Sequence, residues 1–433
     1  MKLSSLIGHT SEISEIVFKS ELPADVLIAR FFKSKKYLGS NDRKFIAENL
    51  YDLLRNKLKI EKLLNYNFEE NLENENIKIY LIKAIILNNF INGVKINYDE
   101  VTQFLGQGSF DELLKLPETQ FKFNNKLEEL SFNYSIPIWF LEKLNLEHDL
   151  NELEIICKNL NKTAPITLRT NTHKTNIEEL VKSLSSKKIN CEIGNLSPNA
   201  IILKNRLNIF QIDNFKNGEF EVQDEGSQIL AHFVDPKPGK IMLDACCGSG
   251  GKSLALSAIM KNRGEIFAID INPKRLNDIK KRIIRSGSNN IRVEQVDEKI
   301  IPKKYLNFAD YVLVDSPCSG SGTIRRNPGL KWKLNEKNLH ELNIKQSEIL
   351  QNYSATVKVG GRLVYATCSI LKDENENIVN KFLSENNNFK LIDAAEILKR
   401  YNLQNLAKNN YLKLYPHIHN TDGFFAAAFE RIS

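Results

Sequence analysis

Two of the six cysteines in this 433-residue sequence closely follow short apolar runs that have the character of β-strands. Cys318 lies in the segment Asp315-Ser-Pro-Cys-Ser-Gly, and Cys368 lies in Ala-Thr-Cys-Ser. A free cysteine is most often a small buried hydrophobic residue, and that interpretation suits Cys157 and Cys191. At a strand end that opens into a loop, where catalytic groups concentrate, a thiol is a candidate nucleophile. Cys318 and Cys368 are therefore candidate catalytic residues.

These two cysteines belong to a region, beginning near residue 240, in which strand-like and helix-like runs alternate with short connections. The expected strands are 241–244, 266–270, 291–296, 311–315 and 362–366, with another at 424–429. Such alternation predicts an α/β domain with a doubly wound, mostly parallel sheet that carries helices on both faces. Ligands of such sheets bind beyond the carboxyl ends of the strands, so both thiols are expected at the binding edge.

A glycine-rich loop follows the first of these strands, with the sequence Cys246-Cys-Gly-Ser-Gly-Gly-Lys252. Three kinds of nucleotide-binding loop compete for it. A mononucleotide P-loop requires glycine where Cys246 stands, and a dinucleotide fingerprint requires glycine where Ser253 stands. The kind that remains is the S-adenosylmethionine loop of a methyltransferase, in which glycines let the backbone approach the ligand closely.

Four of the expected strands end at or next to an acidic residue, namely Asp244, Asp270, Asp297 and Asp315. One acid at such a position is common as a helix cap, but four in succession around a glycine loop are not readily explained as caps. Asp270 follows the loop by about 20 residues, the spacing at which an acid meets ribose hydroxyls in nucleoside-binding α/β folds. Asp297, which closes the third strand, is expected to reach the adenine.

A methyl donor and two thiols at one sheet edge would suit methylation at C5 of a cytosine. C5 is a poor nucleophile, but a thiolate that adds to C6 makes C5 enamine-like and able to attack a methyl group. A second group then assists loss of the C5 proton and expulsion of the thiolate, and Asp315 could hydrogen-bond the N3/N4 edge of the ring. An ordinary thiol has a pKa of about 8.5, so Cys368 would need a positively charged or hydrogen-bonding environment to be a thiolate at neutral pH.

A basic segment lies between the two cysteine motifs. Arg325, Arg326, Lys331 and Lys333 occur there with Trp332, and no acid is present from residue 317 to 334. Cations and an aromatic side chain beside a proposed active-site loop favour contact with a nucleic acid, and the alternative is a solvated basic loop. The formal net charge of +7 also favours a polyanionic partner, but only weakly because it is spread over the whole chain.

The composition, with 42% hydrophobic and 26% charged residues, is typical of a soluble globular protein with two or three domains. The most apolar run, 77–90, is interrupted by Lys and Asn and predicts a buried helix rather than a membrane span. The N-terminus lacks the features of a secretory signal, which predicts a cytoplasmic location. The few cysteines form no paired Cys-x-x-Cys motifs, so no metal site is expected. We also expect a monomer that does not bind membranes.

The first half of the chain is expected to fold apart from the large sheet. It begins with long stretches of helical periodicity, and a mixed pattern of strand, helix and strand follows at 165–170, 177–184 and 200–203. We therefore expect an all-α domain, then linker helices with a small α+β RNA-binding segment, and then the catalytic domain, at 1–135, 136–235 and 236–433. Arg169 and Asn171 could face a nucleic-acid backbone, although such a pair at a strand end is more often part of a turn.

Taken together, these motifs resemble the RsmB-type (NOP/Sun) family of RNA cytosine-5 methyltransferases. The resemblance covers about the last half of the chain and rests on Asp244 to Ser253, Asp270, Asp315-Ser-Pro-Cys318-Ser-Gly, Arg325-Arg326-Asn327-Pro328, Thr367-Cys368-Ser369 and Asp422-Gly423-Phe424-Phe425. The first part of the chain looks like the NusB-like helical RNA-binding domain of ribosomal members, through Leu38-Gly39-Ser40-Asn41-Asp42-Arg43 and Ile46-Ala47-Glu48.

The resemblance implies a Rossmann-like methyltransferase domain that uses S-adenosyl-L-methionine, with Cys368 attacking C6 and Cys318 helping to release the product. It also implies that the donor is lined by Cys246, Cys247, Gly248, Ser249, Gly250, Gly251 and Lys252, with Asp270, Asp297 and Asp315 completing the site. Many members have Ala-Ala-Pro or Ala-Gly-Ala where this chain has Cys247-Gly248-Ser249. That departure leaves the contacts of these side chains open, and we interpret Cys247 as structural.

The substrate implied by the resemblance is ribosomal RNA of the small subunit (16S), with RNA contacts expected from Arg325, Arg326, Lys331 and Trp332. Two alternatives stay open at this point. The chain could methylate cytosine in tRNA, or it could be a non-catalytic RNA-binding factor of ribosome assembly that retains the fold.

Overall fold

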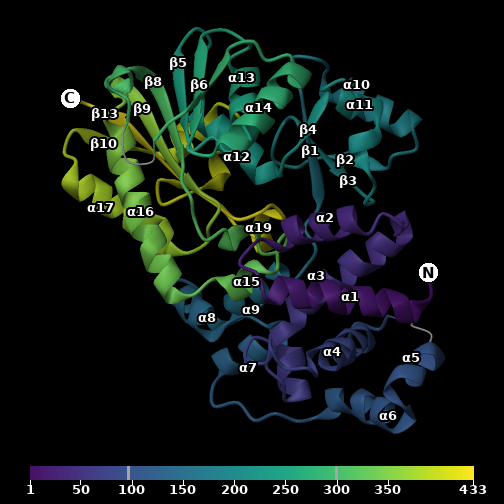
Figure 1. Ribbon diagram of the computed structural model, residues 1–433. Coiled ribbons are helices and arrows are strands. Elements are labelled where there is room, and N and C mark those ends of the chain that lie inside the picture. The colour runs from purple at the N-terminus through teal and green to yellow at the C-terminus, as the bar shows by residue number, and fades with distance from the viewer. Residues whose placement is uncertain (95–97, 298–300) are drawn as a thin grey trace. The chain divides into compact units, whose positions relative to one another are not determined.

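The computed structural model describes residues 1–94, 98–297 and 301–433. They form two compact units, and most of their helices and strands are labelled in Figure 1. Unit 1 comprises Met1–Lys162 together with Ile324–Asn335, and unit 2 comprises Thr163–Thr323 and Glu336–Ser433. The chain therefore leaves unit 2 just after the first cysteine motif and returns to it before the second.

Unit 1 is helical throughout the part that the structure describes, as the sequence predicts. Its helices are α1 (Leu3–Phe18), α2 (Ala24–Ser34), α3 (Ser40–Leu64), α4 (Ile77–Ile91), α5 (Tyr98–Leu105), α6 (Gln107–Lys115), α7 (Lys126–Tyr134), α8 (Ile138–Asn145), α9 (Leu150–Leu160) and α15 (Leu330–Lys333). The N-terminus of α3 is closed by Asp42, whose carboxylate accepts the backbone N–H of Gly39 at 3.0 Å. The apolar run predicted as a buried helix is α4, and its Leu81 and Ile85 lie in the core of unit 1.

Unit 2 begins with a small antiparallel sheet of strand order β2-β3-β1-β4. Its elements are β1 (Ile166–Thr170), α10 (Ile177–Ser186), β2 (Cys191–Ile193), β3 (Ala200–Leu203), α11 (Asp213–Lys216) and β4 (Phe220–Val222). Leu180 and Leu184 of α10 pack on the sheet residues Leu168 and Phe220. The small α+β segment expected from the sequence is confirmed, while β2, β4 and α11 were too short to predict.

The large sheet of unit 2 has the strand order β11-β12-β13-β9-β8-β5-β6-β7, and β10 also pairs with β13. Its parallel strands are β5 (Ile241–Ala245), β6 (Glu265–Asp270), β7 (Ile291–Gln295), β8 (Ala309–Asp315) and β9 (Val357–Thr367). Antiparallel strands follow at β10 (Phe389–Ile392), β11 (Ala407–Lys408), β12 (Tyr411–Leu414) and β13 (Phe424–Arg431). The six expected strands are confirmed, and β10, β11 and β12 were not predicted.

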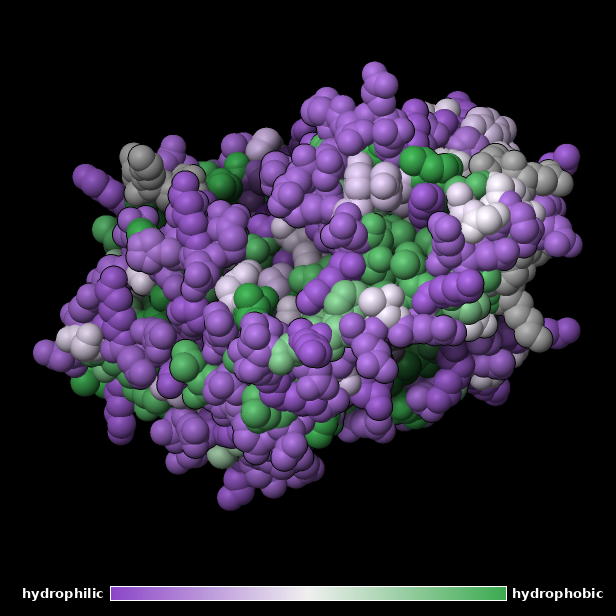
Figure 2. All heavy atoms as spheres, turned by 90° about the horizontal axis from the view of Figure 1, so that it is seen from below, coloured by the Kyte–Doolittle hydropathy of each residue, from purple (hydrophilic) through white to green (hydrophobic). Residues whose placement is uncertain are grey.

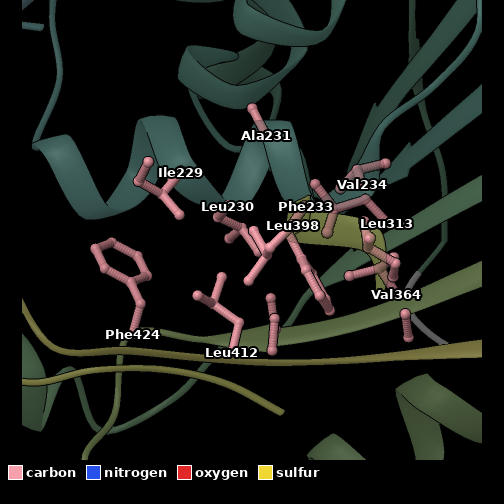
Figure 3. Close-up of a cluster of buried hydrophobic side chains, with 14 of the residues drawn as sticks. Ile229, Leu230, Ala231, Phe233, Val234, Leu313, Val364, Leu398, Leu412 and Phe424 are labelled. Atoms are coloured by element: carbon pink, nitrogen blue, oxygen red, sulfur yellow. The ribbon is translucent and has the colours of Figure 1, made fainter. Parts of the chain in front are cut away.

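Helices cover both faces of this sheet, as a doubly wound fold requires (Figure 1). One face is covered by α12 (Glu225–Val234), α13 (Gly251–Ile259), α14 (Pro273–Ser286) and α18 (Ala394–Lys399), and the other by α16 (Glu336–Ser354) and α17 (Glu376–Glu385). Figure 3 shows Leu230 of α12 pointing toward Leu398 of α18 and Leu412 of β12. Neighbouring residues of a strand serve opposite faces: Val364 of β9 packs in this cluster, and Tyr365 packs on the other face.

The expected domain boundaries, at 135/136 and 235/236, differ from the boundaries of the two units. Helix α7 packs against α3, α8 and α9, so the helices up to residue 160 belong to unit 1. Helix α12 packs against α13 and β13, so it belongs with the large sheet, and the small sheet is part of the same unit. Sequence periodicity could not show these groupings, because it reports local structure and not contacts between distant segments.

Hydrophilic side chains predominate on the face of the molecule shown in Figure 2, with hydrophobic side chains gathered in smaller patches. Among the described residues, no helix combines the length and the apolar character needed to span a bilayer. In the same residues, no group of three or more His, Cys, Asp or Glu side chains is arranged to hold a metal ion.

Candidate active site

The glycine-rich loop joins β5 to α13 at the point where the strand order reverses, with β6 on one side of β5 and β8 on the other. This is the position at which doubly wound sheets bind their ligands. Cys246, Gly248 and Gly250 have φ angles of 62°, 56° and 79°. A side chain at Gly250 would clash with Ile279 of α14, so glycine is required there. A Cβ at Gly248 would have no described atom within 4 Å, which leaves room for a ligand.

Asp270, at the end of β6, accepts hydrogen bonds from the backbone N–H groups of Gly248 and Asn272, both at 2.8 Å. Each carboxylate oxygen takes one of these donors and keeps a lone pair for a hydroxyl group. The backbone of the loop and this carboxylate therefore fit the ribose of a bound nucleoside.

Asp244 and Asp297, two of the other three acids predicted at strand ends, lie in different surroundings. Asp244 is fully buried in β5 and accepts the hydroxyl of Ser253 at 2.5 Å, and burial raises its pKa to about 7. It thus ties the first turn of α13 to the sheet. Asp297 lies just beyond the end of β7 and is exposed.

The two predicted cysteines meet at the carboxyl ends of β8 and β9, which are adjacent parallel strands. Their Sγ atoms are 3.3 Å apart, and both thiols are free. The hydrogen bond with Cys368, together with burial, raises the pKa of the Cys318 thiol well above its usual value. Cys318 therefore holds its proton more firmly than an ordinary thiol, and either sulfur of the pair can donate the hydrogen bond between them.

Lys252 is a positively charged residue that interacts electrostatically with Cys368. Its Nζ donates to Oδ2 of Asp315 at 2.5 Å and lies 5.7 Å from the ring centroid of Phe424. Burial opposes the charged form of this amine, but the charge and hydrogen bond of Asp315, followed by the charge of Cys368, raise the pKa of Lys252 above its usual value. Lys252 therefore stays an ammonium ion in the immediate field of the thiol pair. From sequence it was predicted only as part of the donor loop.

A buried glutamate holds the loop that carries Cys318. Glu374 is fully buried and accepts the backbone N–H of Ser319 at 2.7 Å, the hydroxyl of Ser319 at 2.5 Å and Nε2 of Gln346 at 2.9 Å. Gln346 also donates to the carbonyl of Pro317 at 2.9 Å. Sequence reasoning missed Glu374 and Gln346, and nothing in their local sequence distinguishes them from surface residues.

Two further contacts join the loops that carry the cysteines. The hydroxyls of Ser321 and Ser369 are 2.8 Å apart, and the N–H of Gly322 donates to the carbonyl of Cys368 at 2.9 Å. The N–H of Gly423 donates to the carbonyl of Gly322 at 2.8 Å, and any side chain at Gly322 would clash with the backbone of Gly423. The segment 422–425, which was noted in the sequence and leads into β13, therefore packs against the loop that follows Cys318.

Comparison with known proteins assigns this site to a family. A family model described as 16S rRNA methyltransferase RsmB/F matches residues 231–430, and one described as the ferredoxin-like domain of RsmF/B-like methyltransferases matches residues 136–210. The probable ribosomal RNA small subunit methyltransferase B of Bacillus subtilis is 30% identical over 344 residues, which are 79% of this chain and 73% of that protein. This chain belongs to the RsmB/F methyltransferase family.

Two more similarities extend this result. The 28S rRNA (cytosine(4447)-C(5))-methyltransferase of Homo sapiens is 31% identical over 323 residues, which are 72% of this chain and 40% of that protein. The crystal structure of the protein PH0851 is similar with a TM-score of 0.78 at 27% identity, and the similarity covers 98% of each chain. The family resemblance inferred from the sequence motifs is thus confirmed. The structural similarity to PH0851 extends over nearly the whole chain.

In this RsmB/F protein, two arginines outside the donor loop hold its backbone. Arg169 of β1 donates from Nη1 to the carbonyl of Gly251 at 2.8 Å, and Arg282 of α14 donates to the carbonyl of Ser249 at 2.8 Å. Arg169 is buried, which lowers its pKa to about 10. The interpretation that it faces nucleic acid is therefore wrong. Asn171 is also buried and donates to two backbone carbonyls, in accordance with the alternative that it belongs to a turn.

The basic segment 324–335 requires a larger correction. Lys331 is 2% exposed, and its Nζ donates to the carbonyls of Arg55 and Ser135, both at 2.8 Å, and to Asn161 at 3.0 Å. The indole of Trp332 donates to the carbonyl of Leu54 at 2.7 Å and packs in the core of unit 1.

The predicted RNA contacts by Lys331 and Trp332 are thus contradicted, because these side chains anchor the segment inside unit 1. Arg325 is 3% exposed and likewise cannot present its side chain to RNA. Arg326 is exposed and is the member of this group that could meet RNA.

Proposed function

We propose that this chain transfers a methyl group from S-adenosylmethionine to C5 of a cytosine in ribosomal RNA, with Cys368 bonded covalently to C6 during the reaction. The observation that carries the proposal is the Cys318–Cys368 pair, 3.3 Å apart, in the field of the Lys252–Asp315 ion pair. The Bacillus subtilis relative is named for the small ribosomal subunit and the human relative for cytosine C5, which supports a cytosine in 16S rRNA.

The loop from Cys246 to Lys252 is the proposed site of the methyl donor, which when bound supplies an electrophilic methyl group. Asp270 would accept the ribose hydroxyls, since each of its oxygens retains a lone pair. Asp297, exposed beyond β7, would lie on the adenine side. The family and its use of this sheet edge support these roles.

The nucleophile in this proposal is Cys368, because its partner thiol is the one that keeps its proton. The S–H of Cys318 and the nearby ammonium of Lys252 both stabilise a negative sulfur on Cys368. Attack of this thiolate forms the S–C6 bond and shifts an electron pair toward C5, which then takes the methyl group. Asp315, on the adjacent strand, would hydrogen-bond the N3/N4 edge and orient the ring.

Cys318 acts in product release in the same scheme. Loss of the C5 proton to solvent leaves an electron pair that re-forms the C5–C6 double bond and breaks the S–C6 bond. The departing sulfur becomes a thiolate again and accepts the hydrogen bond of Cys318. Without that donor the sulfur is a poorer leaving group, so the covalent intermediate should persist.

The test compares the wild type with Cys368→Ala, Cys318→Ala and, as a matched control, Cys191→Ala, which removes a free cysteine of β2. Each protein is incubated with 16S rRNA and labelled S-adenosylmethionine, and covalent protein–RNA complexes are separated under denaturing conditions. We expect Cys318→Ala to accumulate the complex, Cys368→Ala to form none and Cys191→Ala to turn over like the wild type. The reverse pattern for the first two variants would contradict the roles assigned here.

The same assay on tRNA distinguishes the substrates. Methylation of tRNA and not of 16S rRNA would replace the proposed target and leave the chemistry intact. Binding of S-adenosylmethionine by calorimetry addresses the remaining alternative, since a non-catalytic assembly factor would bind no donor.

A further inference from the structure

A buried ion-pair network joins the small sheet of unit 2 to helix α14, which runs beside it (Figure 1). Glu221 of β4 is 2% exposed. Its Oε2 accepts from Nη2 and Nε of Arg282, at 2.9 Å and 3.2 Å, and its Oε1 accepts from Nη2 of Arg285. Glu221 also stands opposite Arg169 in the pairing of β4 with β1. Burial lowers the pKa of Arg169, and the charge of Glu221 opposes that shift. One buried carboxylate thus interacts with three guanidinium groups.

Two of these arginines also reach the backbone of the glycine-rich loop. Nη1 of Arg282 donates to the carbonyl of Ser249 at 2.8 Å and to its hydroxyl at 3.1 Å. Nη1 of Arg169 donates to the carbonyl of Gly251 at 2.8 Å. A Cβ placed on Gly251 would lie 3.7 Å from Nη2 of Arg282, so this guanidinium lies directly against the start of α13. Arg282 therefore holds Glu221 with one edge of its guanidinium and the loop with Nη1.

The planar shape of the guanidinium links these two contacts. Its N–H groups point in fixed directions in one plane, so a carboxylate that holds Nε and Nη2 also fixes the direction of Nη1. The bond from Nη1 to the carbonyl of Ser249 then fixes the peptide plane between Ser249 and Gly250. The N–H of Gly250, in the same plane, donates to the carbonyl of Cys247 at 2.9 Å and closes the turn of the loop. The turn is thereby tied to a carboxylate in the small sheet.

We propose that Glu221 is a positioning residue for the methyl donor, and that it acts through Arg282 to keep the glycine-rich loop in the conformation that binds S-adenosylmethionine. This inference rests on the proposed function, which places the donor at that loop. A loop that is already held in its binding conformation avoids the cost of becoming ordered when the ligand binds. Loss of the Glu221–Arg282 contact should therefore weaken donor binding, although neither side chain belongs to the loop.

The hydroxyl of Ser249 adds a contact that many family members lack, because they have proline or alanine at this position. Ser249→Ala removes the bond from Arg282 to the hydroxyl and leaves the bond to the carbonyl. The dissociation constant of S-adenosylmethionine should therefore rise only about threefold in Ser249→Ala, as expected for one hydrogen bond of ordinary strength.

The deciding variant is Glu221→Gln, with S-adenosylmethionine titrated calorimetrically into the full chain. Glutamine keeps the side-chain shape but turns one acceptor into a donor, so the bonds to Arg282 and Arg285 cannot both persist. The dissociation constant of the donor should rise roughly tenfold, the effect of losing one hydrogen bond between charged groups. Asp235→Asn is the matched control. Asp235 is also buried and contacts two arginines, but these belong to β9 and to the segment after α18. Asp235→Asn should lower thermal stability and leave donor affinity unchanged.

A double-mutant cycle separates positioning from general stabilisation. If Glu221 acts through Arg282, adding Glu221→Gln to Arg282→Gln should raise the dissociation constant no further than Arg282→Gln alone. Thermal denaturation checks that each variant is folded. Arg282→Lys takes the place of Glu221→Gln if the latter does not fold, because the side chain of Arg282 is 20% exposed. Lysine keeps the charge but lacks the planar fork that reaches both Glu221 and Ser249, so donor affinity should again fall roughly tenfold.

Steady-state kinetics supply a second readout. Glu221→Gln should raise KM for S-adenosylmethionine and leave KM for 16S rRNA and kcat at saturating donor near the wild-type values, because Glu374 and Gln346 support the loop of Cys318 separately. Wild-type donor affinity in Glu221→Gln, independent effects of Glu221→Gln and Arg282→Gln, or an equal loss of affinity in Asp235→Asn would each overturn the inference. Failure of the wild type itself to bind S-adenosylmethionine would instead contradict the proposed function.

Discussion

Lys252 in unit 2 and Lys331 in unit 1 are both buried lysines, and their surroundings shift their pKa values in opposite directions. Lys252 meets the carboxylate of Asp315, whose charge outweighs the cost of burial and raises the pKa. Lys331 meets only neutral oxygens, two backbone carbonyls and one side-chain amide, and burial lowers its pKa well below the usual value. Both lysines are buried, so the group that each one contacts decides whether its pKa is raised or lowered.

This difference supports different proposed roles for the two lysines. A lysine held as an ammonium next to a carboxylate and a thiol pair can stabilise a thiolate. A lysine whose three N–H groups are used by three neutral acceptors can only tie segments together, here the inserted residues 324–335 to α3 and to residues near α7 and α9. From sequence alone both lysines stood in motifs that favoured function.

The largest expected effect is that of Lys252→Met on catalysis. Loss of the ammonium leaves Asp315 unpaired and removes positive charge near Cys368, so the rate of methyl transfer should fall by roughly 10²–10³-fold. The rate is measured in single turnover on 16S rRNA, with folding checked by circular dichroism. Lys280→Met, at an exposed lysine of α14, is the matched control. A single-turnover rate of Lys252→Met within tenfold of the wild-type rate would contradict the proposed role of Lys252 in catalysis.

Lys331→Met should instead act on stability. It leaves three buried acceptors without their donor, and relief of the buried charge offsets only part of that cost, so the free energy of unfolding should fall by about 2 kcal/mol. Urea denaturation measures the change, with Lys158→Met, at an exposed lysine of α9, as control. The single-turnover rate of the folded variant should stay near that of the wild type. A rate loss as large as that of Lys252→Met would show that the segment serves catalysis directly.

The smallest expected effect is a difference in pH dependence. The pKa of Lys331 is lower in the folded than in the unfolded chain, so below the ordinary value of 10.5 the unfolded chain binds more protons, and this lysine makes stability rise with pH. The pKa of Lys252 is raised, so its stabilising contribution is complete below 10.5 and is lost as the pH rises through its folded value.

Urea denaturation of the wild type and both variants from about pH 8 to 11 tests this difference, and no single group can contribute more than about 1.4 kcal/mol per pH unit. The stability advantage of the wild type over Lys331→Met should grow toward pH 10.5. The stability advantage of the wild type over Lys252→Met should be constant below pH 10.5 and should shrink above pH 10.5. If the unfolding free energies of the two variants changed in the same way with pH, the opposite pKa shifts of the two lysines would be contradicted.

Much of the catalytic edge could be predicted because its signals are local. Each strand of the parallel sheet is a short apolar run, and its carboxyl end is marked by an acid, a glycine loop or a cysteine. Parallel strands bring such ends to one edge, so Cys318 and Cys368 could be expected together without knowing any contact between them. Gly250 could be predicted in the same way, because the loop before α13 needs a residue with a positive φ angle.

The sequence by itself determined the doubly wound sheet, the edge that carries the two thiols and the family to which the chain belongs. Only the tertiary structure decided which charged groups meet at the candidate active site. Glu374 reaches Ser319, Lys252 reaches Asp315, and Lys331 reaches Arg55, all across long stretches of chain. A residue type fixes which groups a side chain can offer, but its charge state and its role depend on partners that the fold brings from elsewhere. For this reason Lys252 pairs with Asp315 at the candidate active site, whereas Lys331 and Trp332 pack inside unit 1.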